Sequence, residues 1–529
     1  MPSRLAAIPV RAHTGILVGA LALAGCTDTV FRDREPFNPP PDQASGFLGY
    51  FTTSDRQTSC GNCHAGIQGR WVETAHAQAY QDLVANPGAQ DFCFTCHTVS
   101  ENGNPAGLTG QPAGWNVVED TAYHDVQCES CHGPGFEHAQ APDETNAPLA
   151  RAGVKDTAAS CAACHSGTHH PFVEQWAQTG HADSTTNAYP GNRTECASCH
   201  NGKAFIVAAR GGQTRFVEEG GGAYQFAITC ATCHDPHSNV NEGQLRFPID
   251  DPAPENNLCM RCHNRSTEPT TSFTRGSRGA HASQGPVLLG QGAGWIPPGF
   301  IYDTNQVFTS HASVANPRLC AGCHVNSFEV TDQATGDFVF QSVGHLFSPN
   351  PCLDAQGIPV KDNTCAYTST ARNWSSCTAS GCHGSVDVAV QLLNTERTQV
   401  QQLVDVLWQD LNADQVLDAA PTDAGYLPLV FQSTPTEFVG TDNKLTTAEG
   451  VLFNVMMLAE DLYDHHDGSK GVHNPFFYEA LLSASIEAMQ AAYPGLPPAA
   501  PPVQALMQKA LSRPGISFDR AKFRAVAVR

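Results

Sequence analysis

Residues 128–135 read CESCHGPG, and the first five of them, Cys-x-x-Cys-His, are the pattern that decides the fold. The same spacing occurs eight times in the 529-residue chain, far above chance for its 21 Cys and 23 His. The motifs, numbered 1 to 8 in chain order, are Cys60/Cys63/His64, Cys93/Cys96/His97, Cys128/Cys131/His132, Cys161/Cys164/His165, Cys196/Cys199/His200, Cys230/Cys233/His234, Cys259/Cys262/His263 and Cys320/Cys323/His324.

This spacing suits covalent attachment of haem c. The two sulfur atoms bond to the haem vinyl groups, and the next residue presents its imidazole to the iron from one side. A structural zinc site would instead need paired Cys-x-x-Cys units that converge, and a thioredoxin-like motif needs neither the histidine nor eight copies. The repeats therefore predict eight haems, with the motif histidines as proximal iron ligands.

A ninth motif has a wider loop, with four residues between Cys377 and Cys382, followed by His383. We expect a ninth haem there. The alternative is a disulfide from either cysteine to Cys352 or Cys365, which would leave His383 free. If the ninth haem is present, we expect Cys352 and Cys365 to pair with each other in an oxidising compartment.

Charge and composition narrow the class of protein. The 29 Lys and Arg against 51 Asp and Glu give a net charge of −22, which is the wrong sign for a broad nucleic-acid surface. The 46 Gly and 36 Pro predict much loop. We expect a mainly α and irregular fold organised by its buried haems, with a few short β-hairpins and a C-terminal helical region.

The N-terminus predicts a lipid anchor. Residues 1–25 carry two arginines before an apolar run, and Leu23-Ala24-Gly25-Cys26 resembles a bacterial lipobox. Cleavage would leave Cys26 as the lipidated first residue, followed by a Pro-rich linker over 26–45. The alternative, an uncleaved signal anchor, has an apolar run shorter than the roughly 17–25 residues of a spanning helix. We expect an outer-membrane lipoprotein on the periplasmic or cell-surface face.

The rest of the chain divides into two predicted domains. Residues 46–384 contain all nine motifs, and turn signals within them predict β-hairpins over 205–217 and 328–340. Residues 385–529 lack the motif and show helical periodicity over 392–411, a capping box before the apolar run at 451–458, and a helix opened by Pro475 over about 476–493. We expect this helical region to pack on the haem domain, with Met456, Met457 and Met489 in its core.

Thirteen histidines remain for nine irons after the proximal ligands and His13 of the signal are set aside. Surface exposure or hydrogen bonding is the alternative for any one of them. Two candidates share a Trp-to-His context, Trp71 to His76 and Trp176 to His181. The ten candidate distal ligands are His76, His124, His138, His170, His181, His237, His281, His311, His345 and His473.

From about residue 51 to 475 the chain resembles bacterial multihaem c-type cytochrome lipoproteins, and CESCHGPG and the Trp176–His181 segment are similar to nitrification-type tetrahaem and octahaem cytochromes. The resemblance implies that closely packed haems pass electrons along a chain. Its partners would be other redox proteins or an electron acceptor in the periplasm or outside the cell. It implies contact with the membrane only through the lipid, and no nucleic acid.

Two other functions stay open at this point. A multihaem oxidoreductase of the nitrite or hydroxylamine type needs an iron with a free position, but the nitrite-reductase variant Cys-x-x-Cys-Lys is absent from the sequence. A conductive extracellular filament would take some distal ligands from a neighbouring subunit, in an oligomer. The supply of histidines favours an electron-transfer protein without catalytic residues.

Overall fold

A computed structural model describes most of the chain from residue 38 onward. The described residues are 38–104, 111–143, 145–146, 161–183, 194–209, 226–265, 269, 281–307, 310–361, 364–440, 442–458 and 467–527. The predicted signal peptide, Cys26 and the first part of the linker lie outside them. In the part of the chain that is described, no helix is long and apolar enough to cross a membrane.

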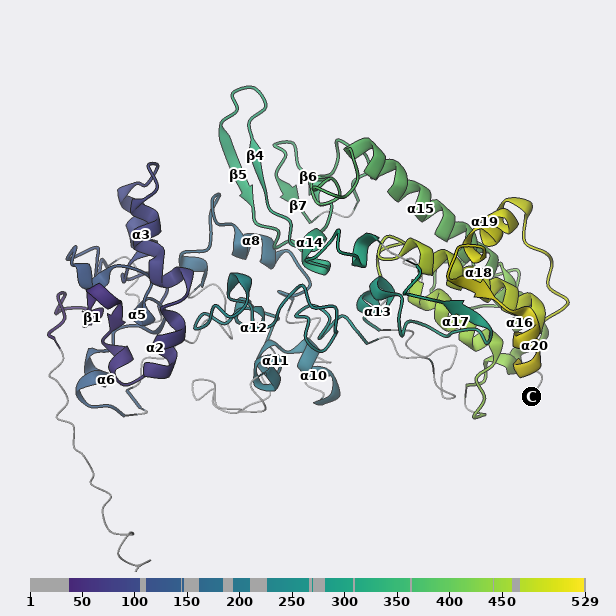
Figure 1. The fold of residues 1–529 in the computed structure, drawn as a ribbon, viewed down its shortest axis with the longest axis horizontal. Helices are drawn as coiled ribbons and strands as arrows, with labels where there is room; N and C mark the ends of the chain where they lie inside the picture. The colour runs from purple at the N-terminus through teal and green to yellow at the C-terminus, as the bar shows by residue number, and fades with distance from the viewer. Residues whose placement is uncertain are drawn as a thin grey trace, which may run out of the picture. The chain divides into compact units, whose positions relative to one another are not determined.

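Short helices dominate the region of the motifs (Figure 1). Cysteines three apart with a following histidine fall on one side of a helical turn, which is why several motifs lie on helices. The helices are α2 (Ala65–Trp71), α3 (Ala79–Val84), α4 (Phe94–His97), α5 (Cys128–His132), α6 (Phe136–Gln140), α8 (Phe172–Ala177), α10 (Thr194–His200), α11 (Gly202–Ala209), α12 (Cys230–Cys233), α13 (Gln284–Leu289) and α14 (Cys320–His324).

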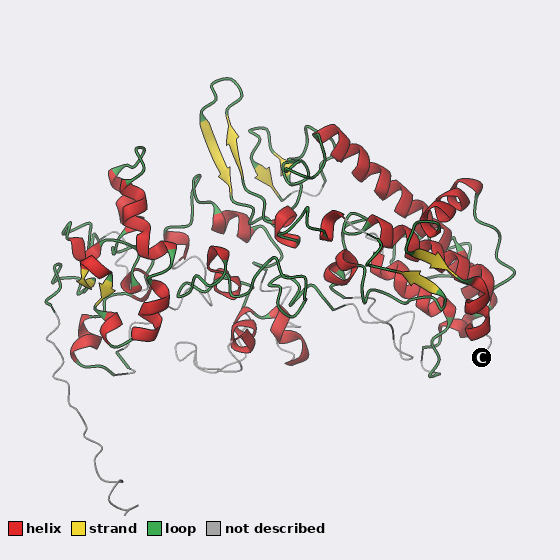
Figure 2. Ribbon diagram, viewed as in Figure 1, coloured by secondary structure: helices red, strands yellow, loops and turns green. Residues whose placement is uncertain are grey.

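Within the described residues the strands form four two-stranded antiparallel sheets, drawn yellow in Figure 2. The predicted hairpin over 328–340 is confirmed, with Val330 opposite Phe340 and Gly336 at φ 77° in the turn. The pairs are β1 (Tyr50–Thr52) with β2 (Gln57–Thr58), β3 (Phe300–Tyr302) with β8 (Ile516–Phe518), β4 (Phe328–Thr331) with β5 (Phe338–Ser342), and β6 (Cys352–Leu353) with β7 (Pro359–Val360).

The predicted hairpin over 205–217 is wrong where it can be compared. Residues 202–209 form α11, and 210–217 lie outside the described residues. Phe205 and Ile206 are both buried. The same segment contains three alanines, which have high helical propensity and favour a helix here. Tertiary burial and the helical propensity of alanine outweigh the strand preference of the β-branched and aromatic residues in this segment.

Longer helices make up the C-terminal region, as the periodicity predicts. Ser385 caps the first of them by accepting a hydrogen bond from Val388 N at 3.3 Å, and Asn474 caps α18 by accepting from Phe477 N at 3.1 Å. The helices are α15 (Val386–Leu407), α16 (Tyr426–Ser433), α17 (Thr447–Leu458), α18 (Pro475–Ala492), α19 (Pro501–Leu511) and α20 (Arg520–Ala527).

The predicted capping box of α17 is present. Glu449 N donates to Thr446 Oγ1 at 3.1 Å, and Thr446 N donates back to the Glu449 carboxylate at 2.9 Å. Met456 and Met457, on the same helix, and Met489, on α18, are buried in the core, as predicted.

Helix α18 lies at the centre of the C-terminal core and contacts α15, α17, α19 and α20. The same core includes Val287, Phe300 and Val307, which precede the predicted domain boundary at 384/385. Strand β3 also pairs with β8. The segment around β3 is therefore packed with the C-terminal helices although it precedes motif 8 in the chain.

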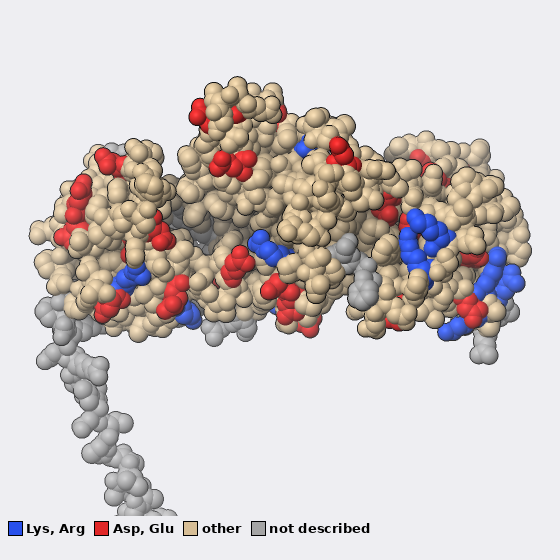
Figure 3. Space-filling model, turned by 45° about the horizontal axis from the view of Figure 1, so that its top comes forward, with Lys and Arg blue, Asp and Glu red and all other residues tan. Residues whose placement is uncertain are grey.

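Charged side chains are sparse on the surface face drawn in Figure 3, in keeping with the 15% of charged residues in the sequence. Acidic groups are scattered over that face rather than collected in one patch. The excess of acid is thus spread over that face, while Lys and Arg gather mainly on the right of the view.

Candidate haem sites

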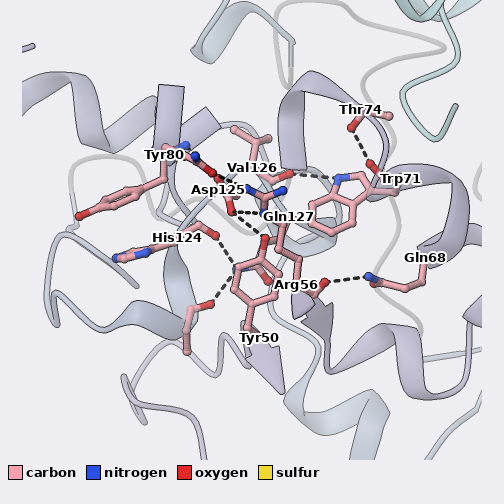
Figure 4. Close-up of polar contacts among 12 residues, drawn as sticks. Tyr50, Arg56, Gln68, Trp71, Thr74, Tyr80, His124, Asp125, Val126 and Gln127 are labelled. Carbon is pink, nitrogen blue, oxygen red and sulfur yellow. Dashed lines mark hydrogen bonds and ion pairs between the residues drawn. The ribbon is translucent and has the colours of Figure 1, made fainter. Parts of the chain in front are cut away.

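The segment from Trp71 to His76 is fixed by hydrogen bonds to the residues just before motif 3 (Figure 4). Trp71 Nε1 donates to Val126 O at 3.2 Å, and Thr74 Oγ1 donates to Trp71 O at 2.7 Å. Val126 N donates to His76 O at 3.0 Å. These bonds hold the backbone of His76 against the start of α5.

The segment from Trp176 to His181 repeats this arrangement before motif 6. Trp176 Nε1 donates to Ile228 O at 2.8 Å, Thr179 Oγ1 donates to Trp176 O at 2.8 Å, and Ile228 N donates to His181 O at 2.9 Å. The similarity of the two Trp-to-His segments in the sequence therefore extends to their hydrogen bonds. The chain uses one structural unit twice, displaced by three motifs.

Seven motif histidines each face a histidine from outside the motifs. In every pair the ring centroids are 5.8 to 6.3 Å apart. The pairs are His132 with His237, His165 with His76, His200 with His281, His234 with His345, His263 with His181, His324 with His473, and His383 with His311.

This spacing fits an iron between the two rings. A metal–imidazole bond is about 2 Å long and a ring nitrogen lies about 1 Å from the ring centre, so two rings on opposite sides of one iron have centres about 6 Å apart. Direct packing of two histidine rings would give no reason for the same spacing in seven places. The residues present thus fit haem with two imidazole ligands.

Backbone hydrogen bonds orient several of these rings. The Nδ1 atoms of His324, His345 and His234 lie 2.8, 3.0 and 2.7 Å from the carbonyl oxygens of Phe347, Val343 and Gly243. Because a carbonyl oxygen can only accept, Nδ1 carries the proton and donates it. Nε2 is then left unprotonated, which is the state that binds a metal.

The pKa values of the paired histidines favour the same state. Burial lowers the pKa of His165, His181 and His324 to about 4, and burial also lowers that of His76. A ring with such a pKa is neutral at pH 7, as a metal ligand must be.

His473 differs from the other paired histidines. Burial lowers its pKa, but the charge of Asp467 and a hydrogen bond to that carboxylate outweigh the burial, and the pKa is raised. Its ring therefore interacts with an ionised carboxylate. The ring of His324, its partner in the pair, donates to a peptide carbonyl instead.

Two predicted distal ligands, His170 and His138, lie outside the seven pairs. Burial lowers the pKa of His170, and the nearby His97 lowers it further, which places His170 close to motif 2. The neighbouring His169 stacks on Phe338 with ring centroids 4.3 Å apart. His138 Nδ1 donates to Asn146 Oδ1 at 3.0 Å, leaving Nε2 available.

The structure places His124 in an aromatic cluster and not opposite a motif histidine. Its ring stacks on Tyr80 with centroids 3.5 Å apart and lies 5.3 Å from the Trp115 ring (Figure 4). The adjacent Asp125 is buried and accepts hydrogen bonds from Tyr50 Oη at 2.8 Å and from Tyr80 N at 2.9 Å. This placement gives His124 packing contacts with two aromatic rings, and its role as a distal ligand stays a prediction.

Two motif cysteines differ in exposure from the rest. Cys63 of motif 1 and Cys382 of motif 9 are exposed, whereas the other motif cysteines are partly buried. His64, next to Cys63, is exposed as well. The protein chain alone therefore leaves one attachment residue of motif 1 and one of motif 9 uncovered.

The local structure of motif 1 explains the exposure of Cys63. Helix α2, which follows the motif, buries Gln68 and Trp71 and turns its other residues outward. One of these is Ile67, four residues after Cys63 and 40% exposed, so an apolar side chain lies exposed next to the motif. A macrocycle attached at Cys63 would cover this face, which keeps Cys63 as a predicted attachment residue.

Sequence reasoning missed two phenylalanines that connect sites. Phe172 lies between His165 and His345, with ring centroids 5.4 and 4.9 Å away. Phe347 lies between His345 and His181, at 5.6 and 4.9 Å. The ligand candidates of motifs 4, 6 and 7 are thus joined by aromatic contacts, which no local signal in the sequence indicates.

Sulfur atoms of different motifs also meet. The motif cysteines carry thiols where the attached haem would have thioethers, so contact between two motifs would bring the vinyl edges of their two haems together. A thiol of another motif lies close enough to shift the pKa of Cys60 (Cys128), Cys96 (Cys164), Cys230 (Cys161), Cys199 (Cys262) and Cys320 (Cys259).

Backbone and side-chain contacts support these pairs. Thr58 Oγ1 accepts from Gly61 N of motif 1 at 3.0 Å and lies 3.7 Å from Cys128 Sγ of motif 3. Cys96 Sγ lies 3.7 Å from the carbonyl oxygen of Ala163 in motif 4. Cys199 Sγ lies 3.8 Å from that of Arg261 in motif 7.

Three more motif pairs are neighbours by weaker contacts. Burial and the nearby Cys161 of motif 4 raise the pKa of Cys131 in motif 3, and burial and the nearby Cys377 of motif 9 raise that of Cys323 in motif 8, so the motifs of each pair are neighbours. Motifs 6 and 7 contribute to one hydrophobic cluster with Phe205. The contacts 1–3, 3–4 and 2–4 thus recur as 4–6, 6–7 and 5–7, the same displacement by three motifs.

Cys352 and Cys365 are joined by a disulfide, with their Cα atoms 6.0 Å apart. The cysteines of motif 9 are free, and His383 N donates to Cys377 O at 3.0 Å, which closes the wide loop into a turn. The structure therefore adopts the pairing that leaves motif 9 available for haem.

Comparison with known proteins agrees with the motif pattern. Residues 59–133 match the family described as cytochrome c554 and c-prime, and residues 225–268 match a doubled CXXCH motif. Both stretches belong to the repeated unit described above, the first to motifs 1 to 3 and the second to motifs 6 and 7.

Two curated relatives are multihaem proteins. The chain is 24% identical to the multiheme cytochrome MtrA of Shewanella baltica over 216 residues, which is 37% of this chain and 60% of the relative. It is 25% identical to the C-type polyheme cytochrome OmcB of Geobacter sulfurreducens over 305 residues, 51% of this chain and 36% of the relative. The matches thus span less than two thirds of either relative.

Among solved structures, the outer cell wall cytochrome OcwA is similar, with a TM-score of 0.45 and 15% identity over 84% of this chain and 100% of that chain. The motifs and the matches in sequence together identify the protein as a bacterial multihaem c-type cytochrome. It carries covalently attached haem c.

Proposed function

We propose that this cytochrome passes electrons along a row of haems, each held between two imidazoles, at the bacterial cell envelope. The observation that carries the proposal is the set of seven histidine pairs with centroids 5.8 to 6.3 Å apart. Iron with imidazole on both sides has no open position for a substrate and changes oxidation state with little ligand rearrangement.

The proposed sites number nine, including motif 9. The seven pairs would supply both ligands to the irons of motifs 3 to 9. Proximity favours His170 as the second ligand of the iron at His97. His138 is the better remaining candidate for the iron at His64, because its Nε2 is available while His124 is stacked on Tyr80.

The contacts between motifs support a branched electron path. Following contacts from one motif to the next gives the order 1–3–4–6–7–8–9. Motifs 2 and 5 would be side branches on motifs 4 and 7. The order in space therefore differs from the order in sequence.

The exposed cysteines support motifs 1 and 9 as the ends of this path. Cys63 belongs to motif 1 and Cys382 to motif 9, and these are the two motif cysteines that the chain leaves exposed. A haem attached there would present an edge to solvent, where a redox partner could exchange electrons with it. The haems between them would be covered by the chain.

We retain the remaining predictions as part of the proposal. Cys26 would carry the lipid, the mature chain would sit at the outer membrane, and the motif domain over 46–384 would be followed by the helical region over 385–529. Its partners would be other redox proteins or an acceptor in the periplasm or outside the cell. The net charge of −22, with haem propionates added, favours partners with a basic surface.

Carbon monoxide tests the proposal, since it binds ferrous haem at an open position. We expect the reduced native protein to bind none on rapid mixing, while it still exchanges electrons with a dye or a small cytochrome. Rapid binding at one or more haems, together with turnover of nitrite or hydroxylamine, would contradict the proposal and favour an oxidoreductase.

A further inference from the structure

The loop that precedes α18 holds two of the paired histidines through different acceptors. His311 Nδ1 lies 2.5 Å from Val472 O, a peptide carbonyl. His473 Nδ1 lies 2.5 Å from Asp467 Oδ1, a carboxylate oxygen. Both acceptors require Nδ1 to carry the proton, but only the carboxylate brings a full negative charge to the ring.

Asp467 is built into this position. Its side chain is 0% exposed. Ser469 Oγ and Tyr478 Oη both donate hydrogen bonds to Oδ2, and Ser469 N donates to the same atom at 3.2 Å, so Oδ1 is the oxygen that faces His473. The histidine that pairs with His473 is His324 of motif 8.

We propose that Asp467 is a positioning residue that lowers the reduction potential of the haem attached at motif 8, by strengthening His473 as an iron ligand. The inference rests on the proposed function, which makes His473 the sixth ligand there. The step concerned would be the transfer of one electron from a ferrous neighbouring haem, which becomes ferric, to ferric iron at motif 8, with no bond broken and the Nδ1 proton retained on the ring.

The physical reason is electrostatic. A carboxylate that accepts from Nδ1 draws the proton toward itself and gives the imidazole part of an imidazolate's charge, which makes Nε2 a stronger donor. A stronger donor and a nearby buried negative charge both stabilise the ferric form, which carries one more positive charge. Ser469 and Tyr478 moderate the effect, because their hydrogen bonds take up part of the charge of Asp467.

A second carboxylate provides a graded comparison. Asp235 Oδ1 lies 3.5 Å from Nδ1 of His237, which pairs with His132 of motif 3. Its side chain is 24% exposed and lies 3.6 Å from Arg246. The longer distance, the exposure and the neighbouring cation all weaken its effect, so we expect Asp235 to influence the haem at motif 3 much less.

The test is a spectroelectrochemical titration of the full haem-loaded protein. We expect Asp467→Asn to move one redox transition to higher potential and Tyr478→Phe to move the same transition to lower potential, because the second change returns charge to the carboxylate. Asp235→Asn should give a smaller shift. Asp423→Asn is the matched control, since Asp423 is buried but accepts from Trp408 Nε1 at 2.7 Å instead of a histidine, and it should move none.

Opposite signs distinguish this role from a structural one. Equal potentials in native protein and both variants, or shifts of the two variants in one direction, would overturn the inference. If Asp467→Asn does not fold, the direction of the Tyr478→Phe shift decides alone. A separate variant, His473→Ala, tests the proposed function itself. If His473 is not an iron ligand, this variant keeps the low-spin near-infrared and electron paramagnetic resonance signals of native protein.

Discussion

The region of the motifs and the C-terminal region bury hydrophobic side chains in different ways. In the C-terminal region one continuous cluster surrounds α18 and reaches back to Val287. In the described part of the motif region the buried hydrophobic residues form four separate clusters, of which the largest have four members. The C-terminal region therefore has one continuous hydrophobic core made of side chains, and the motif region does not.

The difference shows where the motif region obtains its stability. A chain segment of more than 300 residues with such small clusters cannot offset the conformational entropy of its many loops. Nine macrocycles, each fixed by two thioethers and by iron ligands, would supply the missing apolar area and cross-links. We therefore expect the haems to serve as both the core of this region and its redox centres.

The largest expected effect follows from withholding haem. A chain produced without haem attachment should show no protection from hydrogen exchange over residues 46–280, while amides of α15, α17 and α18 keep a substantial part of theirs, because their core is made of side chains. Hydrogen exchange read by mass spectrometry on haem-free and haem-loaded protein measures this. Equal loss in both regions would contradict the comparison.

A second prediction concerns the protein core alone. Leu403 on α15 is 0% exposed, so Leu403→Ala should lower the free energy of unfolding of the C-terminal region by about 2–5 kcal/mol. The haem absorption spectrum should be unchanged before unfolding. Leu392→Ala, at an exposed position of the same helix, is the control and should cost little. An equal loss in both variants would mean that α15 is not held by this core.

Local patterns in the sequence predicted local structure well. The Cys-x-x-Cys-His motifs, the capping box of Thr446 and Glu449, and the helix opened by Pro475 are each defined within a few residues. The hairpin expected over 205–217 failed because Phe205 and Ile206 are buried by contacts from distant parts of the chain, which no local pattern specifies. The exposure of Cys63 has the same origin, since burial of a motif depends on which distant segments reach it.

The pairing of histidines shows the same limit. The sequence predicted ten distal candidates, and seven of them lie opposite motif histidines, but it gave no means of matching them. His345 lies 111 positions after its partner His234, and His473 lies 149 after His324. Such pairs depend on how loops return through space. The repeat of the Trp-to-His context was a usable signal, since the two histidines that end it occupy equivalent places in the repeated unit.

A third prediction tests individual sites in the motif region. His76→Ala and His181→Ala should each convert one low-spin haem to high spin without loss of haem, because the thioethers remain. His169→Ala is the control, since His169 stacks on Phe338. Absorption and electron paramagnetic resonance spectra give the fraction converted, about one haem in nine by the proposed count. Unchanged spectra in both variants would assign these histidines to packing.

The smallest expected effect lies in the protein core and depends on pH. Glu396 on α15 lies near Glu479 of α18, and burial, with a contribution from Glu479, raises its pKa to about 8. The folded state therefore favours the protonated carboxyl. Since the pKa in the unfolded chain is near its usual 4.5, this contribution to stability is complete below pH 4.5 and is lost as pH rises toward 8.

Glu396→Gln removes the titration while it keeps the shape of the side chain. We expect the variant to gain thermal stability relative to native protein as pH rises from 5 to 8, and the difference to level off above pH 8. Melting of the C-terminal helices, followed by circular dichroism, measures it. Asp405→Asn, also on α15 but bonded to Gln401 at 2.8 Å, should show no such growth. A difference that shrinks with rising pH would mean that Glu396 is ionised in the fold, and that the C-terminal region holds a second buried carboxylate charge besides that of Asp467.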